Sequence, residues 1–265
     1  MRSRAFTLIE LLVVIAVIAL LMAILMPSLQ LARDQAKRIH CVSNTKTLIL
    51  GWLMYKDEYD GKLIPGHTGV RTDPDVGWVN QRQWVNDPPA DDSPLHLKLQ
   101  AIREGLLFKY VGEETGIYHC PADRRKQVGS TAFRTFSIVG GAHGESGVNW
   151  GYNRVTLYTD IKQPSTKYVM VEEMDTRGYN KGSWQMHPGS QTWTDPVAMW
   201  HNKKSTLGFA DGHAEMHTWE SQSFIEWNEK AMYTPAQFTF GMTPPADDRV
   251  DVEYMAEGFP YRSLR

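Results

Sequence analysis

The chain of 265 residues lacks a strong net charge, because 28 lysines and arginines nearly balance 30 aspartates and glutamates. A chain this close to neutral shows no electrostatic footprint for nucleic acid, so we expect no nucleic-acid partner. The sequence also lacks low-complexity runs and internal repeats of fixed period, which excludes a repeat architecture.

Recognisable catalytic motifs are absent as well. The sequence contains no G-x-S-x-G, no H-E-x-x-H and no P-loop. Carboxylates are present, but the sequence places no two of them across a cleft. Cys41 lies on a predicted helix and does not carry the signature of a nucleophile. We therefore expect a protein that is not an enzyme and has no cofactor.

Cysteine is scarce, with only Cys41 and Cys120 in the chain. If the domain that carries them lies outside the cytoplasm, the two can form a disulfide. Such a bond would tie the N-terminal helix to the rest of the chain and contribute roughly 4 kcal/mol by closing a long loop. Two separate buried thiols are the alternative, because spacing alone does not show that two cysteines are close.

The chain does have a long apolar segment at its start. After a basic leader (residues 1–4), the segment runs from Phe6 to Met26, with Glu10 as its one acid and Pro27 directly after it. About 20 apolar residues in a helix span the hydrocarbon core of a bilayer. The segment is too long for a secretory signal core and has no small-residue cleavage site after it. We therefore predict a transmembrane helix over 6–26.

The run AFTLIE (residues 5–10), followed by LLVVIAVIALLMAILMP, resembles the N-terminus of type IV prepilins and type II secretion pseudopilins. The resemblance implies that a prepilin peptidase cuts between Ala5 and Phe6 and that the new amine is methylated. Pro27 matches the helix-kinking proline of this family. Ala5 departs from the glycine that usually precedes the cut. The implied partners are the peptidase, the inner membrane and other pilin or pseudopilin subunits.

Glu10 is the unusual residue of the apolar segment, because a carboxylate facing lipid is costly and is by default functional. In a bundle of such helices, the free amine of Phe6 on a neighbouring subunit would supply its cation. Glu10 would then set the register of assembly. The alternative is a carboxylate that lies in the headgroup layer and does little.

Charge does not settle the orientation of the helix in the membrane. The leader is basic, which favours a cytoplasmic N-terminus, but Arg33, Lys37 and Arg38 lie just beyond the other end. The resemblance implies a single-pass protein with its N-terminus in the cytoplasm and its main domain outside.

Helical spacing of apolar residues continues after Pro27 and stops at Asp60-Gly61. We expect a leader over 1–5, one long helix over 6–60, and an extracytoplasmic domain over 61–265. The expected fold class is α+β and pilin-like, with the long helix packed on a mainly antiparallel sheet. Within the domain we expect a short helix or turn at 101–111, strands within 131–139 and 167–172, and a hairpin at 201–219.

His201, nine further residues and then Asp211-Gly212 resemble the H-X9-DG segment of planctomycete-type prepilin-like proteins, as does the CPAD segment at 120–123. Asp-Gly favours a two-residue type I′ turn. Such a turn pairs position 209 with 214 and 207 with 216, and puts these four residues on one apolar face.

The other face of this hairpin carries polar side chains that offer nitrogen and oxygen ligands. The weak candidates for a metal site are His201, Asp211, His213, Glu215 and His217. Alternating polar residues on a strand equally describe a solvated face, so we predict no metal. The acidic cluster Glu172, Glu173 and Asp175 is likewise expected to be solvated.

The leading functional hypothesis is a structural subunit of a type II secretion pseudopilus or type IV pilus-like fibre, assembled through its apolar helix. The alternative is a membrane-anchored module that binds carbohydrate. Its candidate stacking residues lie in tryptophan-rich loops: Trp78, Trp84, Trp184 and Trp193. A third, weaker hypothesis is a membrane-tethered hydrolase with an unrecognised site.

Overall fold

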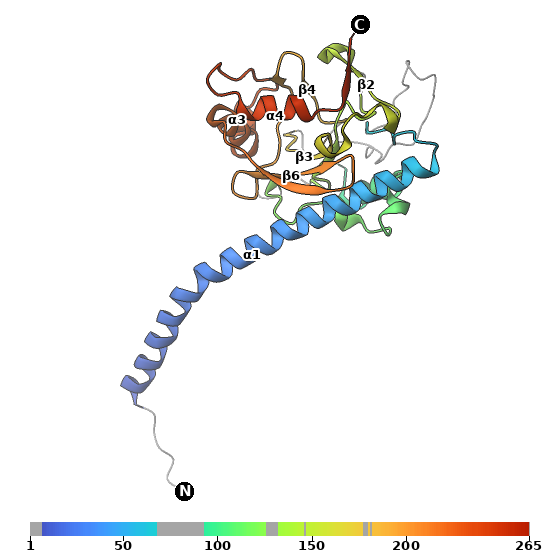
Figure 1. Ribbon diagram of the computed structural model, residues 1–265. Helices are drawn as coiled ribbons and strands as arrows, with labels where there is room; N and C mark the ends of the chain where they lie inside the picture. Colours follow the sequence, from blue (N-terminus) through green and yellow to red (C-terminus); the bar gives the residue numbers. More distant parts are fainter. Residues whose placement is uncertain are drawn as a thin grey trace.

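The computed structural model describes residues 7–67, 93–125, 132–145, 147–176, 180 and 182–264. Its longest element is helix α1 (Leu8–Glu58), which leaves the globular head and extends away from it (Figure 1). The helix ends where Asp60 and Gly61 take positive φ angles of 53° and 79°. A left-handed glycine just past the last turn is a common helix stop. The long N-terminal helix predicted from the sequence is confirmed.

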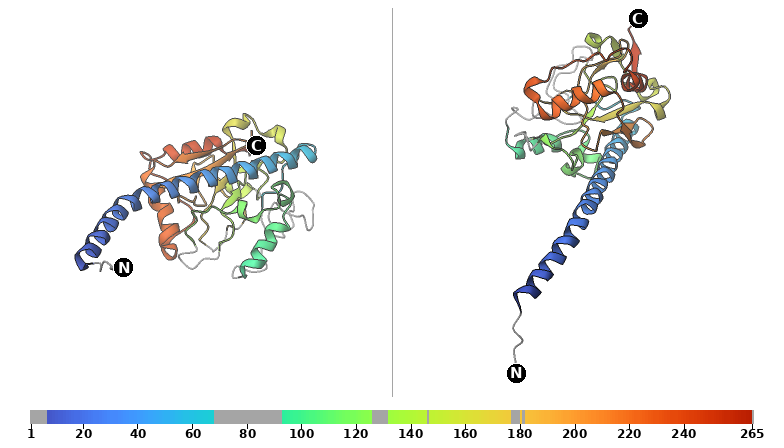
Figure 2. Two further views of the ribbon diagram at one scale, coloured as in Figure 1. Left: turned by 90° about the horizontal axis from the view of Figure 1, so that it is seen from below. Right: turned by 90° about the vertical axis from the view of Figure 1, so that its left-hand side faces the viewer.

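Helix α1 has two halves with different surroundings, as both views in Figure 2 show. The first half is exposed on all sides, and the chain remains helical through Pro27. The second half lies along the head. Its buried residues begin at Cys41 and recur at helical spacing to form one packed stripe: Cys41, Asn44, Thr45, Leu48, Ile49, Gly51, Trp52 and Tyr55.

A four-stranded antiparallel sheet forms the centre of the head, in the order β1-β3-β6-β7. The two central strands, with the sequences YVMVE in β3 and KSTLGF in β6, are buried along almost their full length, as expected for strands covered on both faces. The strands are β1 (Phe136–Ile138), β3 (Tyr168–Glu172), β6 (Lys204–Phe209) and β7 (Ala214–Thr218). The predicted α+β fold is confirmed.

The sheet lies between α1 on one side and α3 (Gln222–Tyr233) and α4 (Val250–Gly258) on the other (Figure 1). On the α1 side, Gly208 allows close approach, because a Cβ there would lie 2.5 Å from Ile49 Cγ1. On the α4 side, the Tyr168 hydroxyl donates to the Met255 carbonyl at 2.6 Å. Helix α1 thus packs closely on the sheet because Gly208 has no side chain. Helix α4 is held on the other side by packing and by the Tyr168–Met255 hydrogen bond.

The remaining described elements are short and frame the sheet. Helix α2 (Leu95–Arg103) lies near the expected helix or turn at 101–111. Two further antiparallel pairs are β2 (Tyr152–Arg154) with β8 (Tyr261–Ser263), and β4 (Met186–His187) with β5 (Thr192–Trp193). The 3₁₀ turns are η1 (Phe108–Tyr110), η2 (Thr115–Tyr118), η4 (Val148–Trp150), η5 (Tyr158–Asp160), η6 (Pro164–Thr166) and η7 (Pro235–Gln237).

The hairpin β6–β7 forms where expected, but its predicted register is wrong by one residue. Leu207 pairs with Glu215, not with Met216, and Gly208 pairs with Ala214. The turn has three residues, because the Phe209 N–H donates to the His213 carbonyl. Gly212 closes it at a φ of 104°. A three-residue turn with a left-handed glycine is a standard alternative to the type I′ turn. Because side chains alternate, this slip moves every residue of β7 to the opposite face.

Two of the four tryptophans expected to stack on carbohydrate lie in the core. Trp184 and Trp193 are fully buried. Trp193 stacks on Phe224 with ring centroids 3.8 Å apart. Both side chains are therefore part of the hydrophobic core, and neither can stack on a sugar. Trp78 and Trp84 lie outside the described residues.

Candidate functional site

The N-terminal end of α1 carries the first candidate site. The Glu10 carboxylate accepts hydrogen bonds from the Thr7 backbone N–H and hydroxyl, both at 2.8 Å. In return, the Glu10 N–H donates to Thr7 Oγ1 at 3.2 Å. This reciprocal capping box fixes where the helix begins and holds the carboxylate beside the first turn. Ala5 and Phe6, the predicted processing residues, lie outside the described residues.

The apolar half of α1 has no protein surface against it within the described chain. Its most apolar 18-residue window has a mean hydropathy of 3.2 and none of it is buried. Leu8 is 79 % exposed and Ile24 is 67 % exposed. A helix that is apolar on all sides is stable where lipid or other apolar helices surround it. Among the described helices, α1 is the one long and apolar enough to cross a membrane.

Comparison with known proteins finds a match in the same N-terminal segment. Residues 1–26 match the family model described as "Prokaryotic N-terminal methylation motif". This match supports a type IV pilin-like protein. It covers the leader and the apolar half of α1 and does not extend into the head. Neither the curated proteins nor the solved structures include a match to the chain.

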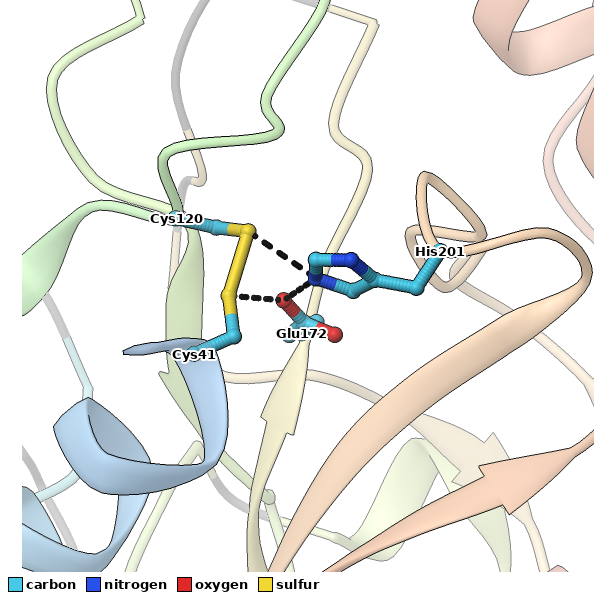
Figure 3. A group of neighbouring side chains, drawn as sticks. All are labelled: Cys41, Cys120, Glu172 and His201. Atoms are coloured by element: carbon cyan, nitrogen blue, oxygen red, sulfur yellow. Dashed lines mark hydrogen bonds and ion pairs between the residues drawn. A yellow bond between two sulfur atoms is a disulfide. The ribbon is translucent and has the colours of Figure 1, made fainter. Parts of the chain in front are cut away.

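A second candidate site lies where α1 enters the head, and we call it the sulfur cluster (Figure 3). Cys41 from α1 and Cys120 from the turn after η2 form a disulfide with Cα atoms 5.5 Å apart. Glu172, at the end of β3, lies beside it with Oε1 3.0 Å from Cys41 Sγ. His201, from the loop before β6, places Nε2 3.2 Å from Cys120 Sγ. Four distant parts of the sequence thus meet at one point.

The sulfur cluster is shielded from solvent and includes two side chains that can be charged, Glu172 and His201. Cys41, Cys120 and Glu172 are fully buried, and His201 is 3 % exposed. Glu172 Oε2 accepts the Thr206 backbone N–H at 2.6 Å. Glu172 Oε1 is 3.6 Å from His201 Nε2. A buried carboxylate needs such partners, because an ionised group without them is strongly destabilising.

The CPAD segment next to the cluster forms an ion pair inside the protein. Burial alone would raise the pKa of Asp123, but the Arg125 guanidinium at 2.8 Å and His119 at 3.3 Å hold it well below its usual value. Arg125 also donates to Asn180 Oδ1 at 2.6 Å. These contacts fix the turn that presents Cys120 to α1.

The spacing between His201 and Asp211-Gly212 follows from the position of strand β6. His201 precedes β6 and reaches the sulfur cluster, whereas Asp211 and Gly212 form the turn after β6. The intervening residues are therefore strand β6 and its flanks. An insertion or deletion there would shift either the histidine or the turn.

The five weak candidates for a metal site do not form one group. Asp211 Oδ1 pairs with His213 Nδ1 at 2.6 Å on the surface. Glu215 accepts from the Tyr254 hydroxyl at 3.3 Å. His217 lies 3.4 Å from Asp251. Among the described residues, His201 belongs instead to the sulfur cluster, the one group of potential ligand atoms that all lie within 4.8 Å of one another.

Two features of these sites differ from, or add to, the sequence-based expectations. Glu172, Glu173 and Asp175 are buried, so the expectation of a solvated acidic cluster is wrong. The apolar run YVMV directly before Glu172 is typical of a strand that is buried on both faces. It could have indicated that Glu172, the last residue of this strand, is buried too. The role of Thr7 follows from the T-x-x-E pattern of residues 7–10, which is the sequence signature of a capping box.

Proposed function

We propose that this protein is a structural pilin- or pseudopilin-type subunit. A prepilin peptidase cuts it between Ala5 and Phe6, and the mature chain assembles through α1 into a type II secretion pseudopilus or type IV pilus-like fibre. The exposed apolar half of α1, which carries the methylation motif, is the observation that supports this proposal. Helix packing between copies would remove that surface from lipid or water.

The disulfide supports an extracytoplasmic head. Disulfides form and persist outside the reducing cytoplasm, and the Cys41–Cys120 bond joins α1 to the head. With the leader on the cytoplasmic side, the chain crosses the inner membrane once and the head lies in the periplasm or outside the cell. The tryptophan-based carbohydrate hypothesis has no comparable support, because Trp184 and Trp193 are in the core.

Glu10 gives the assembly its proposed specificity. Cleavage before Phe6 would create an amine only one residue away from Thr7, which already binds the Glu10 carboxylate. In the fibre, the Phe6 amine of a neighbouring subunit is the proposed cation for this carboxylate. A charge pair in a low-dielectric bundle is costly to leave half made, so it would favour one register between helices.

Two substitutions separate the charge of Glu10 from its capping role. Glu10→Gln keeps an oxygen that accepts from Thr7 but removes the negative charge, whereas Thr7→Val removes the hydroxyl of the cap and keeps the charge. We expect Glu10→Gln to insert in the membrane but yield few or no fibres. We expect Thr7→Val to lose only about 1 kcal/mol of helix capping and still assemble. Electron microscopy of sheared fibres and membrane fractionation provide the measurements.

Normal fibres from Glu10→Gln would contradict the register role of the charge. Loss of both membrane insertion and fibres would show instead that the residue acts before assembly. If Thr7→Val alone blocked fibres, the hydroxyl rather than the charge would control assembly.

A further inference from the structure

The sulfur cluster contains the types of side chain that ligate metals. It offers two sulfurs, one carboxylate oxygen and one imidazole nitrogen, all within 4.8 Å of one another. Structural zinc sites use four such ligands in a tetrahedron, with Zn–S of about 2.3 Å and Zn–N or Zn–O of about 2.0–2.2 Å. Neighbouring ligand atoms then lie roughly 3.3–3.8 Å apart. Three of the six separations, S···O at 3.0 Å, S···N at 3.2 Å and N···O at 3.6 Å, lie within or about 0.3 Å below that range. The two sulfurs are bonded to each other, so a tetrahedral arrangement requires that the disulfide is first reduced.

The carboxylate of Glu172 provides a reason for a cation at this place. Its Oε1 faces Cys41 Sγ at 3.0 Å, and a sulfur in a disulfide has no proton to donate. In the part of the chain that the structure describes, the other polar atom beside Oε1 is His201 Nε2, at the longer distance of 3.6 Å. Glu172 Oε2 is already held by the Thr206 N–H. A metal ion between the four side chains would give Oε1, both sulfurs and the histidine nitrogen a common partner.

The surroundings of the cluster also fit metal ligation. The Ala122 backbone N–H points at Cys120 Sγ at 3.4 Å, a contact that stabilises a thiolate. The Thr206 N–H orients the carboxylate, as outer hydrogen bonds commonly do for ligands. His201, which is 3 % exposed, also lines a groove of about 580 Å³ between α1, the CPAD turn and α3, so one of the four proposed ligands lies next to solvent.

We propose that the reduced protein binds one zinc ion through Cys41 Sγ, Cys120 Sγ, Glu172 Oε1 and His201 Nε2. The disulfide is the metal-free state of the same cluster. A dithiol reductant opens the Cys41–Cys120 bond and becomes a disulfide itself, leaving two cysteine thiols. Zinc then binds both sulfurs as thiolates, and their two protons pass to solvent.

The consequence is that α1 stays tied to the head in either redox state. Cys41 is the first buried residue of α1, at the point where the helix leaves the head. A zinc ion there would replace the covalent link when the link is reduced. Metal binding at the sulfur cluster is independent of fibre assembly and can be measured on the single chain.

Cobalt binding to the full-length chain in detergent tests the site. The protein is reduced with a dithiol under anaerobic conditions, freed of reductant, and titrated with Co²⁺. We expect one Co²⁺ per chain, with thiolate charge-transfer bands and the visible bands of tetrahedral cobalt, both lost on adding Zn²⁺. Zn²⁺ should also slow alkylation of Cys41 and Cys120. Absence of the bands in protein shown to have two free thiols would overturn the proposal.

Substitutions identify the ligands. His201→Ala and Glu172→Gln should each weaken Co²⁺ binding on the order of 100-fold or more, and His201→Cys should restore binding with stronger charge-transfer absorption. His213→Ala is the matched control, because its histidine side chain is 41 % exposed and pairs with Asp211. Unchanged binding in a folded His201→Ala protein, or loss of binding in His213→Ala, would contradict the assigned ligand set. If the His201 and Glu172 variants fail to fold, the wild-type alkylation measurement still decides.

Discussion

At the scale of single residues, the contact between α1 and the sheet depends on the absence of a side chain. Gly208 is buried in β6, and a Cβ there would lie 2.5 Å from Ile49 Cγ1 and 2.8 Å from Thr45 Cγ2. Real Cβ atoms do not approach carbon this closely, so any other residue forces α1 away from the strand.

Gly208→Ala should therefore destabilise the head by about 1–3 kcal/mol through overpacking. For a protein of this size, that corresponds to a melting temperature lower by several degrees. Gly189→Ala is the control, because no heavy atom lies within 4 Å of the added Cβ. Thermal unfolding followed by circular dichroism measures both variants. Equal melting temperatures would show that α1 does not pack on β6 as described.

Contacts between single residues are the features that the sequence predicts least. The alternation of β7 predicts a hairpin, but a two-residue and a three-residue turn both fit an Asp-Gly pair. The observed register pairs Gly208, which lies against Ile49 of α1, with Ala214. Glu172 likewise gives no sign in the sequence that its partners are Cys41 and His201, because the four members of the sulfur cluster are far apart in the chain.

At the scale of elements, the disulfide is the covalent joint between α1 and the head. It closes a loop with a sequence separation of 79 residues. Such a loop restricts the unfolded chain and is expected to stabilise the folded one by about 4 kcal/mol.

Cys120→Ser should lower the free energy of unfolding by about 2–5 kcal/mol. A dithiol reductant should lower the stability of the wild type toward that of the variant and leave the variant unchanged. Denaturant unfolding with a chelator present measures this effect apart from any metal. If the reductant shifted both proteins equally, the disulfide would not be the stabilising link.

The C-terminal end of α1 makes a pH-dependent contact. Burial, together with Tyr59 and Tyr110, raises the pKa of Tyr55 from 10.0 to about 12. The folded protein therefore favours the neutral phenol. This contribution to stability is complete below pH 10.0 and is lost as the pH rises toward about 12.

Tyr55→Phe should remove that loss, because phenylalanine does not ionise. The variant should lose less stability than the wild type between pH 10.0 and about 12, as measured by denaturant unfolding at both ends of this range. Tyr233→Phe is the control, since Tyr233 is 54 % exposed. Identical alkaline behaviour of Tyr55→Phe and the wild type would contradict the buried placement of this ring.

At the scale of the whole molecule, the sequence predicts the division into a long N-terminal helix and a globular head. It does not predict the order of the strands in the head. The long helix is predictable because helical periodicity is a local property of the sequence. The apolar run marks its first half, and Asp60-Gly61 marks its end. The strands within 131–139 and 167–172 follow from short apolar runs. Their order, with β3 between β1 and β6, depends on pairings between distant segments that no local pattern encodes.

The proposed topology makes a prediction for the whole chain. If the head lies outside the cytoplasm, protease added to intact spheroplasts should remove a C-terminal epitope tag. A cytoplasmic marker protein should survive the same treatment. A tag that is cut only after the membrane is broken would place the head in the cytoplasm, where the Cys41–Cys120 disulfide would not be expected.

The central claim is that the apolar half of α1 remains on the mature protein after the leader is removed. Terminal sequencing by mass spectrometry of the protein recovered from cell membranes tests it most directly. We predict a chain that begins at Phe6 with a methylated amine and retains α1. A mature chain that still begins at Met1, or that begins after Met26, would contradict the account.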